Sequence, residues 1–461
     1  MTAITSLFFI LFFIGCSSSS NDEFETVIVI ENNAPVANND NATTTSNVAI
    51  TIELFATDNN GDTLIYSIDS QPENGATSLT GATVTYTPTT DFIGEDSLTF
   101  TANDGQVDSN IATISITINE ALAMTTLSDG TEVSTLALIS LGDQVYNDTN
   151  LSSPIGQACA SCHGLSNGFD EPNDTNPTSI GADLVSFGGR NSPTASYAAH
   201  IPNAQMQNGP GGVELIGGLF IDGRALNLEE QAKGPFLNPI EMGNASEADV
   251  ITKISSSSYA SEFETLFGND ILADSERSYN YLADAIAAFE RTELFSPFTS
   301  KFDQVQAGTT IFTAAEQRGQ DLFRNKGDCE RCHRDNANVI VFSDFSYKNI
   351  GVPSNPLLPA FMNDASFIDL GLGAESGDNR NNGQFRVSNL RNISITAPYM
   401  HNGVFNTLRE VIEFYNTRDT TFSDAPEVTQ NVDQGGLIGE LNLTNNEVDD
   451  LIAFMNTFTD Q

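Results

Sequence analysis

The stretch Cys159-Ala160-Ser161-Cys162-His163 decides how this chain folds. It has the spacing C-x-x-C-H, in which two thiols attach covalently to a haem and the adjacent histidine binds the iron. The same spacing recurs at Cys329-Glu330-Arg331-Cys332-His333. The alternative, a pair of zinc knuckles, needs four nitrogen or sulfur ligands at closer range. The sequence therefore predicts two covalently bound haem c groups, with Cys159, Cys162, Cys329 and Cys332 as attachment points and His163 and His333 as iron ligands.

The one cysteine of the five outside these motifs, Cys16, follows an apolar run from Ser6 to Gly15. This run is too short to span a bilayer and is typical of the apolar core of a secretory signal. Its ending resembles a bacterial lipobox, which implies cleavage before Cys16 and lipid on the cysteine sulfur. An ordinary secretory signal is the alternative. Residues 1–15 are therefore predicted to be a signal peptide. The mature protein is expected in the periplasm or cell envelope, touching a membrane only through a lipid anchor.

The charge of the chain is extreme and unevenly distributed. The 461 residues carry a formal net charge of −43, and the first of the 18 basic residues is Arg190. Such a balance excludes nucleic acid and anionic membrane surfaces as partners. The hydrophobic content of 39% is that of an ordinary globular protein. The length indicates two to four domains.

An acidic tether without periodicity covers residues 16–34, and the pattern then changes to alternating apolar and polar residues. Four segments alternate in this way, Val48–Phe55, Thr83–Thr87, Ser97–Ala102 and Ala112–Ile118, separated by turn residues. Alternation with a period of two indicates half-buried strands. We expect an antiparallel β-sandwich over residues 35–119.

Two details refine this expectation. The stretches Tyr86-Thr87-Pro88, Phe92–Phe100 and Asn103-Asp104-Gly105 make the region resemble the cadherin-like, Ig-like repeats of bacterial surface proteins. The turn Asp58-Asn59-Asn60-Gly61-Asp62 carries side chains that shape loops, with calcium binding as the alternative. The region is expected to act as a spacer ahead of the haem-bearing part.

The remainder of the chain has helical periodicity. Apolar residues recur at helical spacing in Ser134–Tyr146, Glu276–Phe289 and Thr313–Phe323, after a linker over residues 120–133. Capping boxes open the helix at Thr313 and a terminal helix at Thr444 that runs to about Phe458. Because one haem motif falls in each half, we expect two mainly α-helical cytochrome c-type domains, over residues 126–300 and 305–461.

Several short motifs bring residues 126–461 close to a known family. They are Gly189-Arg190-Asn191-Ser192-Pro193-Thr194, Asp222-Gly223-Arg224, Glu229-Glu230-Gln231, Asn238-Pro239-Ile240-Glu241-Met242-Gly243, Cys329–His333 and Thr396–Gly403. With these motifs the chain resembles the bacterial di-haem cytochrome c peroxidases of the MauG superfamily.

The resemblance implies an enzyme that reduces hydrogen peroxide to water. Its electrons would come from a small redox protein such as a cytochrome c or a cupredoxin. A MauG-like oxidase that uses peroxide on another substrate is one alternative, and a non-catalytic di-haem electron-transfer cytochrome is another. The assembly is a monomer or a homodimer.

The resemblance also implies the residues of the peroxidatic site. Glu241 corresponds to the family's distal glutamate, and Gln231 lies ten residues earlier, where the family has its distal glutamine. A carboxylate there moves a proton between the two peroxide oxygens. Family members that need reductive activation block the iron with a loop histidine, and Gly164–Gly189 contains no histidine. The first haem is therefore expected to have an open sixth position, with His200 as an ordinary loop residue.

The second haem is expected to have two protein ligands. His333 is one of them, and Tyr415 occupies the position where MauG-like enzymes have a tyrosine ligand, fourteen residues after His401. Met400 is the alternative ligand. The family also has a tryptophan that relays electrons between the haems. This chain has no tryptophan, and Ile221 stands at that position.

A calcium ion between the haems is the last implication of the resemblance. The residues that match the family's calcium ligands are Asn191, through its side chain, and Thr396 and Pro398, through their carbonyl oxygens. Oxygen ligands of this kind suit calcium. The motifs also contain or adjoin four arginines in an arginine-poor chain, which are candidate partners of the anionic haem propionates. They are Arg190, Arg224, Arg386 and Arg391.

Overall fold

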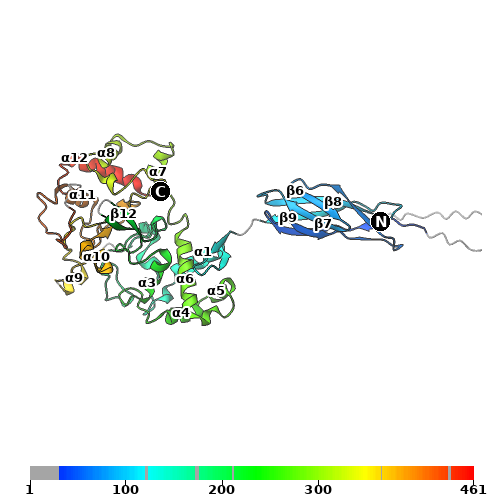
Figure 1. Cartoon of the computed structure of the whole chain (residues 1–461), viewed down its shortest axis with the longest axis horizontal. Coiled ribbons are helices and arrows are strands. Elements are labelled where there is room, and N and C mark those ends of the chain that lie inside the picture. Colours follow the sequence, from blue (N-terminus) through cyan, green and yellow to red (C-terminus); the bar gives the residue numbers. More distant parts are fainter. Residues whose placement is uncertain (1–30, 120–122, 172–175, 210–211, 365, 434–437) are drawn as a thin grey trace, which may run out of the picture. The chain divides into compact units, whose positions relative to one another are not determined.

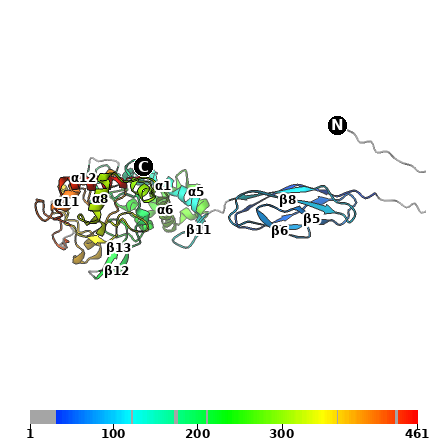
Figure 2. The same ribbon diagram turned by 90° about the horizontal axis from the view of Figure 1, so that it is seen from above.

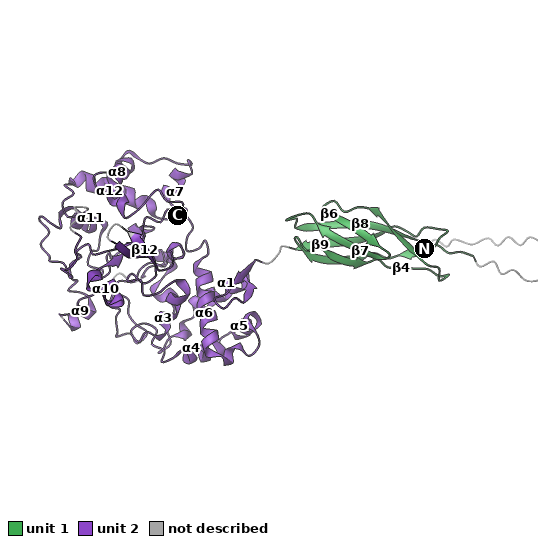
Figure 3. Cartoon of the chain, in the orientation of Figure 1, with its two compact units in different colours: residues 1–121 green, residues 122–461 purple. Residues whose placement is uncertain are grey.

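The computed structural model describes residues 31–119, 123–171, 176–209, 212–364, 366–433 and 438–461. The chain forms two compact units, residues 1–121 and residues 122–461 (Figure 3). The predicted signal peptide, Cys16 and most of the acidic tether lie outside the described residues. Among the helices that are described, none is long and apolar enough to cross a membrane.

The first unit is built from strands, which Figure 1 labels in part. The strands are β1 (Val36–Ala37), β2 (Asp40–Thr45), β3 (Ile50–Glu53), β4 (Ala56–Thr57), β5 (Ile65–Ser70), β6 (Gly75–Thr80), β7 (Thr83–Pro88), β8 (Gly94–Asn103) and β9 (Ala112–Asn119). A four-stranded sheet has the order β2-β9-β8-β5, and a three-stranded sheet has the order β3-β7-β6. The fold-class prediction of an N-terminal β-sandwich is confirmed.

Alternating residues of this unit form its core. In β9 the buried side chains are Ala112, Ile114, Ile116 and Ile118, and the residues between them are more exposed. They pack with apolar side chains of both sheets into one cluster, as a period of two requires. One pairing differs from the antiparallel expectation, because β2 runs parallel to β9. Strand alternation carries no information on the direction of pairing, so the sequence could not show this.

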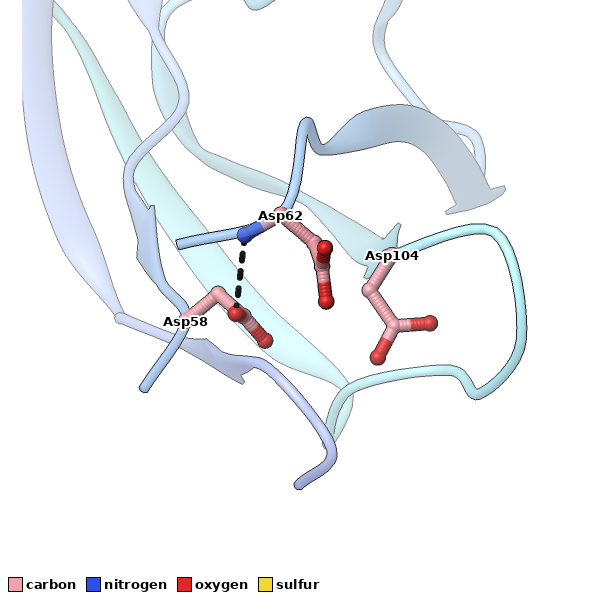
Figure 4. Close-up of side chains that lie close together, drawn as sticks. All are labelled: Asp58, Asp62 and Asp104. Atoms are coloured by element: carbon pink, nitrogen blue, oxygen red, sulfur yellow. Dashed lines mark hydrogen bonds between the residues drawn. The ribbon is translucent and has the colours of Figure 1, made fainter. Parts of the chain in front are cut away.

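Three carboxylates of the first unit lie close together (Figure 4). The ligand-type oxygens of Asp58, Asp62 and Asp104 lie within 4.8 Å of one another. Oδ1 of Asp58 accepts hydrogen bonds from the backbone N–H of Asn60 at 2.8 Å and of Asp62 at 3.1 Å. These are the loop-shaping contacts that the turn sequence predicts.

The second unit is mainly helical, and its ribbon is seen from two directions in Figures 1 and 2. Its α-helices are α1 (Thr135–Tyr146), α2 (Cys159–Cys162), α3 (Leu228–Leu237), α4 (Glu247–Ser255), α5 (Ala260–Phe267), α6 (Ser275–Glu290), α7 (Lys301–Gln306), α8 (Ala314–Arg324), α9 (Pro359–Asn363), α10 (Leu372–Ser376), α11 (Leu408–Thr417) and α12 (Asn445–Met455). Its short strands are β10 (Met124–Thr126), β11 (Glu132–Ser134), β12 (Gln205–Gly209), β13 (Gly212–Ile216), β14 (Tyr347–Lys348) and β15 (Phe385–Arg386). The predicted linker therefore contains a small hairpin, β10–β11.

Single 3₁₀ turns connect these elements. They are η1 (Thr149–Leu151), η2 (Leu165–Asn167), η3 (Ala198–His200), η4 (Ile271–Ala273), η5 (Cys329–Arg331), η6 (Asn379–Asn381), η7 (Ile393–Ile395) and η8 (Asn456–Phe458). The predicted capping boxes are present, with Thr313 and Glu316 opening α8 and Thr444 and Glu447 opening α12.

Two large, separate apolar cores fill most of the second unit, beside one smaller apolar cluster. One joins side chains between Leu127 and Phe295, and the other joins side chains between Phe302 and Phe458. In each core two helices cross at a glycine. A Cβ on Gly142 of α1 would lie 2.1 Å from the Ala285 oxygen of α6, and one on Gly319 of α8 would lie 2.0 Å from the Asp450 oxygen of α12. The close pairs α1–α6 and α8–α12 hold the segments that carry the haem motifs.

Candidate haem sites and active site

The first haem motif opens onto a cavity of about 330 Å³. We call it the N-terminal cavity and define it by Cys159, Cys162, His163, Gln231 and Glu241, all of which line it. The two cysteines begin and end α2 and are free thiols, and burial raises the pKa of Cys159 to about 12. Buried thiols with a raised pKa are unreactive on their own.

The second haem motif opens onto a cavity of about 300 Å³. We call it the C-terminal cavity and define it by Cys329, Cys332, His333, Met400 and Tyr415, which all line it. Cys329 lies in η5, and both of its cysteines are free thiols. Tyr415 lies on α11, whose buried face contains Leu408, Val411 and Ile412. Burial raises the pKa of the Tyr415 phenol.

Both motif histidines are oriented for iron binding. Nδ1 of His163 donates to the carbonyl oxygen of Phe169 at 3.3 Å, and Nδ1 of His333 donates to that of Phe342 at 2.9 Å. Such a hydrogen bond leaves the unprotonated Nε2 as the metal-binding atom. Burial also lowers the pKa of both imidazoles, which favours the neutral form that binds metal. With two thiols beside each histidine, the residues fit a covalently attached haem in each cavity.

Glu241 is held by a tight turn after α3. Its backbone N–H donates to the Asn238 carbonyl oxygen at 3.0 Å, and its Oε1 accepts from Nδ2 of Asn238 at 2.9 Å. Gly243 closes the turn at φ +68°, and a Cβ there would lie 2.5 Å from the Ser153 oxygen. Burial raises the pKa of Glu241, while Arg224 and the Asn238 hydrogen bond act in the opposite direction. A carboxyl with a raised pKa is suited to accept a proton and release it again.

Of the other two residues considered for the first site, Gln231 lines the N-terminal cavity and His200 does not. Gln231 lies on α3, whose N-cap residue Asn227 accepts from the Glu230 N–H. His200 lies in η3 with its ring against Tyr197 and Phe298, and it does not line the N-terminal cavity. His163 is therefore the one histidine among the described residues that line this cavity.

A thin wall separates the two cavities. Asn191, Ile221 and Arg386 line both of them. Ile221 thus stands between the two candidate haem positions. The neighbouring aromatic side chain, Phe220, lines only the N-terminal cavity, under the guanidinium of Arg224 at 3.8 Å.

The residues of the predicted calcium site also meet at this wall. Nδ2 of Asn191 donates to the Pro398 carbonyl oxygen at 2.6 Å, and its backbone N–H donates to the His401 oxygen at 2.8 Å. Thr396 and Pro398 both line the C-terminal cavity together with Asn191.

Of the four arginines considered for the propionates, three are engaged with carboxylates. Arg190 bridges Asp222 and Asp369, and Arg224 also pairs with Asp222. The buried Arg391 pairs with Asp303 at 2.6 Å. Arg386 differs from them, because its Nε and Nη1 are buried without a hydrogen-bond partner among the described residues.

Sequence reasoning missed one carboxyl of the N-terminal cavity. Glu290, at the end of α6, lines the cavity and is only 7% exposed. Burial raises its pKa to about 8. A signal was available, because Glu290 follows Leu282 and Ile286 at helical spacing on a buried face.

Comparisons with known proteins agree with this geometry. Residues 136–310 match the family model "Di-haem cytochrome c peroxidase", and residues 32–117 match "Bacterial Ig domain". The chain is 38% identical to the methylamine utilization protein MauG of Paracoccus denitrificans, over 70% of this chain and 89% of that protein. It is 33% identical to a cytochrome c551 peroxidase of Nitrosomonas europaea, over 59% of this chain and 71% of that protein.

A solved structure is similar as well. The diheme peroxidase BthA of Burkholderia thailandensis aligns with a TM-score of 0.64 and 32% identity, over 74% of this chain and 93% of that one. The chain matches these relatives over most of their own lengths. With a bacterial Ig domain ahead of the second unit, this chain belongs to the family of di-haem cytochrome c peroxidases and MauG.

Proposed function

We propose that the protein is an exported di-haem c-type peroxidase that reduces hydrogen peroxide to water. The observation that carries this proposal is the N-terminal cavity, where Glu241 and Gln231 line the same space as Cys159, Cys162 and His163. The segment Gly164–Gly189 has no histidine that could occupy the iron's open side. The net reaction is H₂O₂ + 2 e⁻ + 2 H⁺ → 2 H₂O.

The chain's own residues supply proton transfer and orientation. A haem bound in the N-terminal cavity supplies the iron on which peroxide is reduced. Glu241 would accept a proton from one oxygen of the peroxide and return it to the other. Asn238 holds the carboxyl through its 2.9 Å hydrogen bond, and the Gln231 amide offers the substrate a donor and an acceptor.

The C-terminal cavity is the second redox site in this proposal. His333 and Tyr415 would hold the iron of a haem bound there, and Met400 is the alternative to Tyr415. A tyrosinate is an anionic ligand that favours the oxidised iron. Electrons enter from a small redox protein, such as a cytochrome c or a cupredoxin, and reach the first site across the wall at Ile221. Because this side chain is aliphatic, the transfer occurs without the aromatic relay found in the family.

A MauG-like oxidase is the second candidate function. Tyr415 favours it, and so does the similarity to MauG of Paracoccus denitrificans. Such an enzyme would use peroxide to oxidise another substrate. Activity with a reduced redox protein as the only electron source separates the peroxidase from this candidate.

Further features complete the proposal. Calcium binds at the wall through Asn191 and the carbonyl oxygens of Thr396 and Pro398, which lie close enough for an Asn191–Pro398 hydrogen bond of 2.6 Å.

Cleavage before Cys16 and lipidation of its sulfur tether the protein to a membrane of the cell envelope. The net charge of −43 keeps nucleic acid away. The protein acts either as a monomer or as a homodimer.

Steady-state peroxide reduction by a reduced cytochrome c tests the proposed function. Glu241→Gln keeps the size of the side chain and removes the proton acceptor, so kcat should fall by roughly 10²- to 10⁴-fold. Glu230→Gln is the matched control, because this side chain is on α3, pairs with Lys233 and is 51% exposed. Mass spectrometry must find both haems attached in each variant. Full activity of Glu241→Gln would contradict the assignment.

A further inference from the structure

Arg386 occupies an unusual position in the wall between the cavities. It lies in β15 opposite Tyr347 of β14, and its backbone N–H donates to the Ile221 carbonyl oxygen at 2.8 Å. Its side chain lines both the N-terminal and the C-terminal cavity, and the residue is 7% exposed. The pairing of two short strands and the hydrogen bond to Ile221 therefore fix this arginine where the two sites meet.

The charge of Arg386 has no counter-ion among the residues that the structure describes. Its Nε and Nη1 are buried and lack a partner, and no ion pair involves it among the described residues. The nearby acidic motif does not compensate for this, since Asp222 is engaged by Arg190 and Arg224. A buried cation without a partner is strongly destabilising. Among the described residues, none supplies the anion that a buried guanidinium of this kind needs.

We propose that Arg386 is an anion anchor shared by both cavities, and that its guanidinium binds a propionate carboxylate of each haem. The inference rests on the proposed function, because it requires two bound haems. The N–H groups of Nε and Nη1 lie on different edges of the planar guanidinium, so each donates to a separate acceptor. Arginine pairs with carboxylates in this way and stays charged at any physiological pH.

A shared cation at the wall has an electrical consequence. A positive charge near both haems favours their reduced states, which carry one positive charge fewer. In the low dielectric of a buried site this effect is much stronger than in water. Arg386 should therefore raise the midpoint potentials of both haems together.

Spectropotentiometric titration of the holoenzyme tests the inference. In Arg386→Gln both midpoint potentials should move to lower values, and Arg386→Lys should restore part of the shift because it keeps the charge but loses the planar fork. Arg380→Gln is the control, since this arginine is 88% exposed and pairs with Asp378 away from both cavities. It removes the same charge and should leave both potentials unchanged.

The outcomes separate the inference from its alternatives. Unchanged potentials in Arg386→Gln, or a shift of one haem alone, would overturn the shared anchor. A free small anion at Arg386 would make the wild-type potentials depend on chloride or phosphate concentration at constant ionic strength, and this result would also overturn it. A protein without two covalent haems would contradict the proposed function itself. Two haems, normal peroxide turnover and insensitive potentials would contradict only the role of Arg386.

Discussion

Single side chains decide the proton chemistry, and Glu241 is the clearest case. Its carboxyl is balanced between burial, which raises its pKa, and the contacts with Arg224 and Asn238, which lower it. Burial is the larger effect, so the pKa of Glu241 lies above its ordinary value. A raised pKa of this kind suits a general acid–base catalyst.

Asn238 should position Glu241 and tune it. Asn238→Ala removes the 2.9 Å hydrogen bond to Oε1, which lowers the pKa of Glu241, so this pKa should rise in the variant. Since the first proton transfer needs the ionised carboxylate, the acidic limb of the pH profile of kcat/KM for peroxide should move to higher pH. We expect a loss of about tenfold near the wild-type optimum. An unchanged limb with an equal loss at every pH would mean that Asn238 acts only on the fold.

Glu290 should make the stability of the protein depend on pH. Its pKa is about 8 in the folded protein, because it is buried, and 4.5 is its ordinary value. Between pH 4.5 and about pH 8 the Glu290 carboxyl ionises in the unfolded chain but not in the folded one. The free energy of unfolding should therefore fall by about 1.4 kcal/mol per pH unit over this range. The penalty is absent below about pH 4 and complete above about pH 8.

The measurement compares denaturant midpoints at about pH 5 and about pH 8 for the wild type and Glu290→Gln. The variant should lose less stability over this interval, because it has no carboxyl to ionise at this site. Glu276→Gln changes an exposed residue in the first turn of the same helix and should behave as the wild type. The same pH dependence in all three proteins would contradict a raised pKa for Glu290.

At the scale of elements, α11 places the candidate ligand of the second haem. Thr407 and Glu410 form a capping box that fixes the start of the helix, and its buried face then brings Tyr415 to the C-terminal cavity. Met400 approaches the same cavity from a loop, with φ at +73°. A helix holds a ligand more rigidly than a loop does.

Substitution of these two residues tells them apart. Tyr415→Phe should change the absorption and electron paramagnetic resonance spectra of the second haem, because it removes the phenolate oxygen. Met400→Leu should leave both spectra unchanged, because it removes only a contact. The reverse pattern would assign the ligand to Met400.

Local elements were the part of the fold that the sequence could predict. The boundaries of α1, α6, α8 and α12 follow from caps and helical periodicity, which depend on neighbouring residues alone. The parallel pairing of β2 with β9 and the crossing of α1 over α6 at Gly142 depend on residues far apart in the chain. No local pattern encodes such contacts.

The candidate site also combines residues that local motifs predict with residues that only the tertiary structure reveals. The spacing of each C-x-x-C-H motif predicted its own haem site, and family motifs led to Glu241 and Gln231. Among four arginines in similar motifs, only the tertiary structure distinguishes Arg386, because its distinction is the lack of a partner. The burial of Glu290 likewise depends on packing around α6.

At the scale of the whole molecule, the Ig domain and the haem-bearing unit are separate compact units. Residues 122–461 contain both cavities, the wall and every residue proposed for chemistry. The peroxidase proposal therefore concerns this unit, and the role of the Ig domain as a spacer stays a prediction.

The central claim is that the first haem is open to peroxide on the side of Glu241. Stopped-flow absorption of the fully ferric protein, mixed with one equivalent of hydrogen peroxide and no reductant, tests it most directly. The Soret band should change within the mixing period, and Glu241→Gln should abolish or greatly slow this change. A wild-type spectrum that stays constant until one electron is added would contradict the claim, because it would mean that a protein ligand blocks the iron.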